Sequence, residues 1–106
     1  MEDYNKRTRE VCGYSVNTES KEIASANILE VEVGTNGFQG GDTGHGCRTY
    51  LRLSNLASTD ISCDVDGDVY ENIGEIVITL GGDTELSTFI DALKFAYERL
   101  KHQSKK

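Results

Sequence analysis

Residues 28–55, ILEVEVGTNGFQGGDTGHGCRTYLRLSN, decide the fold because they join two strand-like runs through a long, glycine-rich loop. Before the loop, apolar residues alternate with Glu30 and Glu32. After it, they alternate with Arg48, Tyr50 and Arg52. Alternation with a period of two is typical of half-buried strands, so the stretch predicts a wide antiparallel hairpin. If the glutamates share a face with the arginines, opposite charges meet across the two strands. Each such contact stabilises the hairpin by a few tenths of a kcal/mol at most.

The loop, residues 35–46, holds five glycines among polar residues, whereas a plain hairpin needs only about two to five residues. Glycines permit positive φ and let backbone N–H groups converge on a phosphate or another anion. Arg48 is placed to add a charge-assisted hydrogen bond, and Phe38 and Tyr50 suit stacking on a base. The alternative is a flexible loop without a function. The predicted ligand-binding residues are Asn36, Phe38, Gln39, Gly40, Gly41, Asp42, Thr43, His45, Arg48 and Tyr50.

Further strands are predicted between the hairpin and the C-terminal region. Residues 59–66 alternate as a third strand, Asp66 and Gly67 form a hairpin-turn signal, and residues 69–73 suit a short returning strand. Residues 75–80, EIVITL, are β-branched throughout most of their length, which favours a central strand covered on both faces.

A helix is predicted from about Thr84 to His102, because apolar residues recur there at spacings of three and four. Asp83 or Thr84 is a suitable N-cap. Residues 1–20 show no sustained period and are interpreted as an arm of uncertain order. We therefore expect one α+β domain over residues 21–103, with a basic tail at 104–106.

The expected architecture is an antiparallel sheet of four or five strands with one long C-terminal helix packed across one face. The other face then needs polar residues or a second subunit to cover it, and the remaining aromatic residues favour a homo-oligomer. With 106 residues, of which 37% are hydrophobic, the chain suits one domain and is too short for two.

Charge and composition restrict the partners. The net charge of -7 argues against broad nucleic-acid binding, because there is no basic field to displace counterions, but it allows a small anionic ligand in a local pocket. No apolar run is long enough to span a membrane and no leader is visible, so a cytoplasmic protein is expected. Three cysteines without a C-x-x-C pair favour reduced structural thiols, and no cofactor or metal site is predicted.

Three short patterns carry weaker chemical signals. The tetrapeptide GGDT occurs at residues 40–43 and again at residues 81–84, where the start of a helix would favour binding of an anion. The alternative is that the repeat reflects chance or turn chemistry. Whether the two segments form one site is open. Asp42, His45 and Arg48, spaced three apart, suit an acid, a base and an anion clamp for hydrolysis, and Cys47 lies beside them as a potential nucleophile. Residues 64–71, DVDGDVYE, lack the spacing of a calcium loop and favour a solvated acidic turn.

The words GTNGFQGGDTGHGCRTYLRL and ITLGGDTELSTFIDALKFA resemble a family of small uncharacterised proteins of bacteriophages, prophages and Firmicute genomes. The resemblance spans roughly residues 26–100, and the glycine-rich loop is its most specific part. The chain is also similar in kind to phage sponge proteins that sequester nucleotide immune signals, such as the Thoeris anti-defence proteins. That resemblance implies a homo-oligomer that holds cyclic ADP-ribose isomers or related nucleotides without cleaving them.

The sequence therefore predicts a non-enzymatic protein that sequesters a small phosphorylated, nucleotide-derived signal, of the cyclic ADP-ribose type or a cyclic oligonucleotide, in the cytoplasm of a host cell if the chain is phage-encoded. Two other classes stay open. One is a phosphoesterase that cleaves such a signal with His45 and Asp42, and the other is a protein-interaction module that inhibits a host enzyme.

Overall fold

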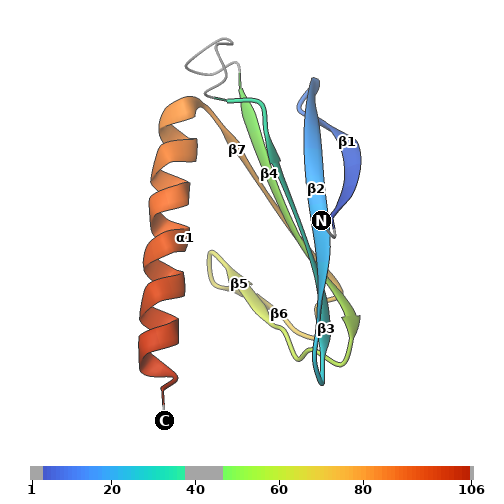
Figure 1. The fold of residues 1–106 in the computed structure, drawn as a ribbon, viewed down its shortest axis with the longest axis vertical. Coiled ribbons are helices and arrows are strands. Elements are labelled where there is room, and N and C mark those ends of the chain that lie inside the picture. The colour runs from blue at the N-terminus through green and yellow to red at the C-terminus, as the bar shows by residue number, and fades with distance from the viewer. Residues whose placement is uncertain (1–3, 38–46, 106) are drawn as a thin grey trace.

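The computed structural model describes residues 4–37 and 47–105, which form an antiparallel sheet, a separate small hairpin and one long helix (Figure 1). The main sheet has five strands in the order β1-β2-β3-β4-β7. Its strands are β1 (Asn5–Val11), β2 (Tyr14–Ala24), β3 (Ile28–Thr35), β4 (Arg48–Ala57) and β7 (Glu75–Gly81). The other elements are β5 (Cys63–Val65), β6 (Asp68–Tyr70) and α1 (Asp83–Gln103). The described chain is thus the α+β arrangement that the sequence predicts.

The hairpin of β3 and β4 confirms the prediction made from residues 28–55. Glu32 pairs with Arg52 and Val33 pairs with Leu51, so charged and apolar residues fall on opposite faces. We call the face with Glu30, Glu32 and Arg52 the charged face, and the opposite one, toward α1, the helix side. The predicted pairing of glutamates with Arg52 is therefore present.

Residues 5–24 correct the prediction of an N-terminal arm of uncertain order. They form β1 and β2, which pair antiparallel along their whole length, so the single domain begins at β1. Cys12 and Gly13 make the two-residue turn between them with φ values of 51° and 85°, the positive values that a type I′ hairpin turn requires. The hairpin curls back until both strands approach β4 and cover the charged face.

The predicted strand at residues 59–66 is wrong in extent, since only Cys63–Val65 are in a strand. This strand pairs with β6 and not with the main sheet. Asp66 and Gly67 form the predicted turn, with φ values of 53° and 89°. The predicted central position of residues 75–80 is also wrong, because β7 pairs only with β4 and lies at the edge.

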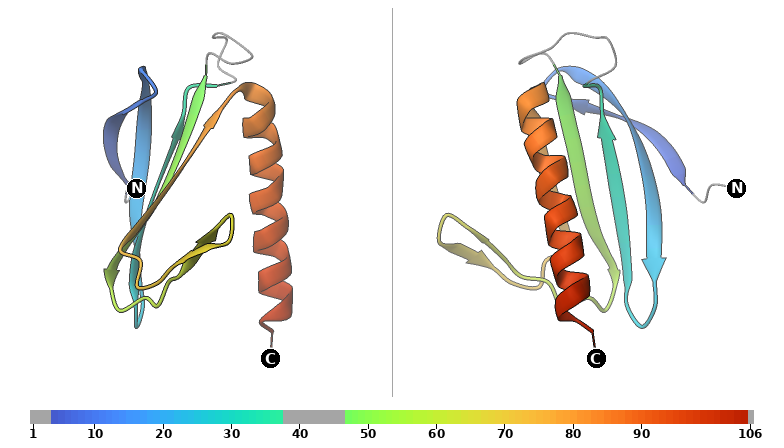
Figure 2. Two further views of the ribbon diagram at one scale, coloured as in Figure 1. Left: turned by 180° about the vertical axis from the view of Figure 1, so that it is seen from behind. Right: turned by 60° about the vertical axis from the view of Figure 1, so that its left-hand side comes forward.

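The predicted helix is confirmed as α1, but its start differs from the prediction. Gly82 is the N-cap, and no side chain caps the helix. Figures 1 and 2 show α1 running beside the sheet and approaching β7 most closely at its N-terminal end. Leu86 is the one buried residue of the helix. The small apolar core lies elsewhere, on the charged face, where Val11, Val16 and Tyr50 form a buried cluster.

Candidate functional site

The two ends of the glycine-rich loop lie against the start of α1. Arg48 pairs with Gly81 across β4 and β7, and the Gly82 N–H donates to the Cys47 carbonyl at 3.1 Å. The Arg48 N–H donates to Asn36 Oδ1 at 2.7 Å, which ties the two sides of the loop together. The second GGDT segment is therefore packed at the base of the loop. The first, residues 40–43, lies outside the described residues.

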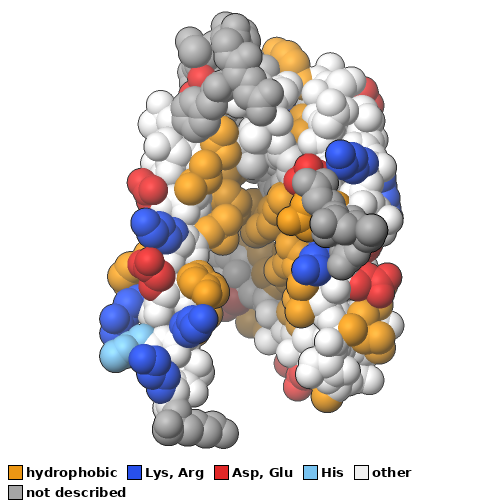
Figure 3. Space-filling view, in the orientation of Figure 1, with side chains coloured by type: hydrophobic (Ala, Val, Ile, Leu, Met, Phe, Trp, Pro, Cys, Tyr) orange, Lys and Arg blue, Asp and Glu red, His pale blue; other side chains and the backbone are white. Residues whose placement is uncertain are grey.

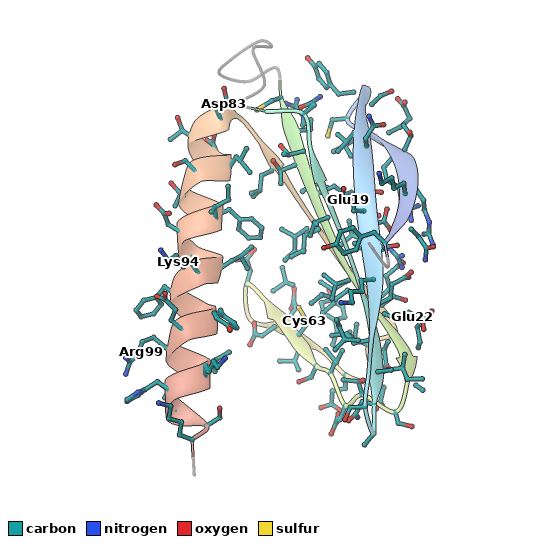
Figure 4. All side chains as sticks on the ribbon, in the orientation of Figure 1. Glu19, Glu22, Cys63, Asp83, Lys94 and Arg99 are labelled. Carbon is teal, nitrogen blue, oxygen red and sulfur yellow. The ribbon has the colours of Figure 1, made fainter. Side chains whose placement is uncertain are left out.

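Gly37, Cys47 and Asp83 form the closest contact between the loop ends and the helix. The Cys47 thiol donates to Asp83 Oδ1 at 3.0 Å, and Asp83 stands at the top of α1 beside the end of the sheet (Figure 4). A Cβ atom on Gly37 would lie 2.7 Å from the same carboxylate oxygen, so a larger residue there would displace the Asp83 side chain. The Asp83 hydrogen bond and burial raise the pKa of the Cys47 thiol. Cys47 is therefore a protonated structural thiol at neutral pH and a poor nucleophile.

Two contacts with described residues hold Arg48 at the base of the loop. Its guanidinium stacks on the Tyr14 ring at 4.7 Å from the centroid, and its Nη1 donates to the Cys47 carbonyl at 2.8 Å. The same nitrogen would lie 3.1 Å from a Cβ on Gly81, which places the positive charge over the turn into α1. The cation is thus positioned in advance at the predicted site, and a guanidinium can bind an oxyanion through two parallel bonds.

Tyr50 does not occupy the role that the sequence assigns to it. Its side chain is only 9% exposed and packs with Val11 and Val16, with the Arg9 guanidinium 5.6 Å from the ring centroid. The β1–β2 hairpin curls over this face and buries the ring. Tyr50 is therefore mainly a core residue, although part of it also lines the cleft between α1 and the sheet.

Asn36 lies at the loop base, where its Nδ2 donates to the Ser15 carbonyl at 3.4 Å. The other predicted site residues lie outside the described part of the chain. They are Phe38, Gln39, Gly40, Gly41, Asp42, Thr43 and His45.

A network of buried ion pairs lies on the charged face. The Glu32 side chain is fully buried, and both its oxygens accept hydrogen bonds from Arg9, at 2.8 and 2.7 Å. Arg52 Nε donates to Glu32 Oε1 at 2.9 Å and Arg52 Nη2 donates to Glu30 Oε1 at 2.6 Å. Thr18 Oγ1 adds a bond of 2.6 Å to Glu32. The positive and negative charges within the network balance, so we interpret its role as stabilising the fold.

The charged surroundings shift the acidity of the central carboxyl group. Hydrogen bonds from Arg9, and then from Thr18 and Arg52, lower the pKa of Glu32 from its usual 4.5 to about 2, against the opposing effect of burial. Glu32 is therefore ionised throughout the physiological range. The sequence alternation indicated the Glu–Arg pairing but not its burial, which depends on the unpredicted β1–β2 hairpin.

A cleft of about 790 Å³ separates α1 from the sheet on the helix side. Figure 3 shows hydrophobic side chains on both walls of this hollow. Leu86, Phe89 and Leu93 line it from α1, and Val33, Thr49 and Leu51 line it from β3 and β4. We call it the α1 cleft. The sequence predicted that the helix packs across the sheet, and it gave no indication of an open cleft.

Comparisons with protein families, curated proteins and solved structures find no match for this chain. Within residues 4–37 and 47–105, no helix is both long and apolar enough to cross a membrane.

Proposed function

We propose that this chain is a non-catalytic binding protein that captures a small phosphorylated, nucleotide-derived signal at the end of the sheet where the loop meets α1. The class of ligand is a cyclic ADP-ribose type or a cyclic oligonucleotide, and the proposed biological role is phage anti-defence. The observation that carries the proposal is the packing of Gly37 and Cys47, the described loop ends, against Gly82 and Asp83 at the start of the helix.

Three features of this end favour an anion. The first turn of a helix presents backbone N–H groups without intrahelical partners, and α1 has no side-chain cap. The loop sequence supplies further glycine amides, which suit close approach to a phosphate. Arg48, stacked on Tyr14, adds a positive charge at the same end. Two carboxylates of the first helical turn, Asp83 and Glu85, oppose an anion, and the neutral Cys47 thiol donates one hydrogen bond to Asp83.

The direct test is native mass spectrometry of the full chain with a mixture of cyclic dinucleotides, cyclic trinucleotides and ADP-ribose derivatives. A stoichiometric adduct of unchanged ligand mass supports capture. A hydrolysed mass would favour the phosphoesterase, in which His45 and Asp42 act. No adduct with any compound would contradict ligand capture and favour a protein-interaction module.

Replacing Arg48 tests the site itself. Arg48→Ala removes a charge-assisted hydrogen-bond donor, so we expect about 10- to 100-fold weaker binding of the captured nucleotide by isothermal titration calorimetry. Arg99→Ala is the matched control, because Arg99 points away from the sheet (Figure 4). Circular dichroism must show that Arg48→Ala stays folded, since the side chain also stacks on Tyr14. Undiminished affinity in a folded Arg48→Ala protein would place the ligand elsewhere.

A further inference from the structure

The apolar stripe of α1 has no partner over most of its length within the described chain. Leu86 is buried, but Ile90, Leu93, Tyr97 and Leu100 are 50%, 46%, 62% and 64% exposed. These residues recur at spacings of three and four, so they share one side of the helix. A helix with so few tertiary contacts is marginal in water, because most helical stability in proteins comes from packing of the apolar face.

The sheet wall of the α1 cleft is apolar at β3 and β4, and it is polar or charged along β1 and β2, where Lys6, Asn17 and Glu19 line it. Val33 on β3 and Ile78 on β7 are 43% and 38% exposed, and both flank Leu51 on the helix side. The β5–β6 hairpin projects on the same side of the sheet as α1 (Figures 1 and 2). Its Val65, Val69 and Tyr70 are each more than half exposed. Exposed apolar residues thus occur on α1, on the facing strands and on the β5–β6 hairpin that projects beside them, and such a concentration marks an interaction surface.

The accessible surface of the chain is larger than that of a monomeric protein of its size. The chain exposes 7701 Å², whereas about 5,900 Å² is expected for a monomer of 11.7 kDa. The excess of roughly 1,800 Å² exceeds the surface of about 800 Å² that each partner covers in a standard interface. A standard-sized interface with another protein chain fits within this excess.

Neither a small ligand nor residues 38–46 of this chain would cover the full length of the apolar stripe. From Ile90 to Leu100 the stripe runs about 15 Å along the helix, beyond Leu93, the last helical residue that lines the cleft. A single small ligand in the cleft would leave Tyr97 and Leu100 exposed. Residues 38–46 contain one apolar side chain, Phe38, which is too little to cover the stripe.

Charge favours a second copy of this chain as the occupant. The C-terminal half of α1 is basic, with Lys94, Arg99 and Lys101 against Glu98, and Lys105 follows the end of the helix. The β5–β6 region is acidic, with Asp64, Asp66, Asp68 and Glu71. A two-fold dimer brings the same patch of both copies together, so the basic helix end of one copy meets the acidic hairpin of the other. This complementarity offsets the repulsion between two chains of net charge -7.

We propose that a second copy of this chain occupies the α1 cleft, with its α1 stripe packed against the helix side of the first copy's sheet. This inference does not rest on the proposed ligand. It assigns the exposed stripe and the open cleft to one self-complementary interface.

Sedimentation velocity of the full chain, from nanomolar to high micromolar concentration, tests the proposal. We expect a wild-type assembly that Leu93→Asp converts to a monomer, because the change places a charge inside the stripe. Phe95→Asp is the matched control: Phe95 is 67% exposed but lies on the opposite side of the helix from Leu93, so assembly is retained. A wild-type monomer at high micromolar concentration would overturn the proposal, and so would disruption by Phe95→Asp.

A second measurement needs no variant and covers the case in which Leu93→Asp fails to fold. Because only the folded chain can fill the cleft of another copy, the wild-type Tm should rise with protein concentration. Hydrogen exchange should show α1 amides more protected at high than at low concentration. A Tm and exchange pattern independent of concentration, or a monomer that binds a hydrophobic dye in the cleft, would overturn the proposal.

Discussion

The two faces of the sheet reverse the usual distribution of residues. On the charged face, Glu32 is 0% and Arg52 is 7% exposed, whereas on the helix side Val33 is 43% exposed. Buried charge is costly unless every charged group is paired, and exposed apolar surface indicates a missing partner. The difference shows that, among the described residues, the β1–β2 hairpin covers the charged face, whereas the helix side stays open.

The largest expected effect comes from removing the central carboxylate of the charged face. Glu32→Ala leaves the guanidinium groups of Arg9 and Arg52 without their shared acceptor in a buried site. Breaking a buried pair in this way costs about 3–5 kcal/mol of unfolding free energy. The midpoint of urea unfolding at pH 7 measures the loss.

Glu32→Gln is the control for packing. It keeps the shape of the side chain and a carbonyl acceptor but removes the charge, so a loss close to that of Glu32→Ala would show that charge, not volume, is essential. If both variants unfold at the wild-type urea concentration, the charged face is not a major source of stability.

Acid should remove the same contribution gradually. The pKa of Glu32 is lowered in the folded chain from 4.5 to about 2, so its stabilising effect is complete above pH 4.5, decreases as the pH falls, and is lost below about pH 2. The linked free energy is about 3 kcal/mol. Urea midpoints between about pH 5 and pH 2 should therefore fall more steeply for the wild type than for Glu32→Gln. Parallel curves would mean that Glu32 titrates with an ordinary pKa.

The contrast between the faces also explains which elements the sequence predicted. The β3–β4 hairpin and α1 carry clear apolar periods, and both are confirmed. The β1–β2 hairpin carries none, because its buried positions include Thr18 and Ser20 as well as Val16, and the half-buried Arg9 also faces the buried Glu32. A period-two pattern of hydrophobicity cannot reveal a strand whose inward side is polar.

Other errors arise from properties that are not local in sequence. Residues 75–80 are apolar on both faces and were predicted to be central, but β7 lies at the edge of the sheet. Its Ile78, 38% exposed, pairs with Leu51 and belongs to the helix side that the described residues leave open, whereas Val77 pairs with Arg52 on the charged face. Tyr50 was assigned to a ligand because the hairpin that buries it was not foreseen. No local sequence pattern predicts that the ends of the glycine-rich loop lie beside α1. Their position depends on the pairing of β4 with β7, which brings Arg48 and Gly81 together.

The smallest effect should come from the rim of the charged face. Arg52 Nη1 donates to Glu75 at 3.0 Å, but the Glu75 side chain is 54% exposed. Water and salt screen such a pair, and Arg52 retains Glu30 and Glu32 when it is broken, so Glu75→Ala should cost at most about 1 kcal/mol. Urea midpoints at low and high salt measure this cost, which should shrink as salt is added. If Glu75→Ala instead costs as much as Glu32→Ala at both salt concentrations, the ion pairs act as one indivisible unit, and the stability of the charged face would then depend on its exposed rim as much as on its buried centre.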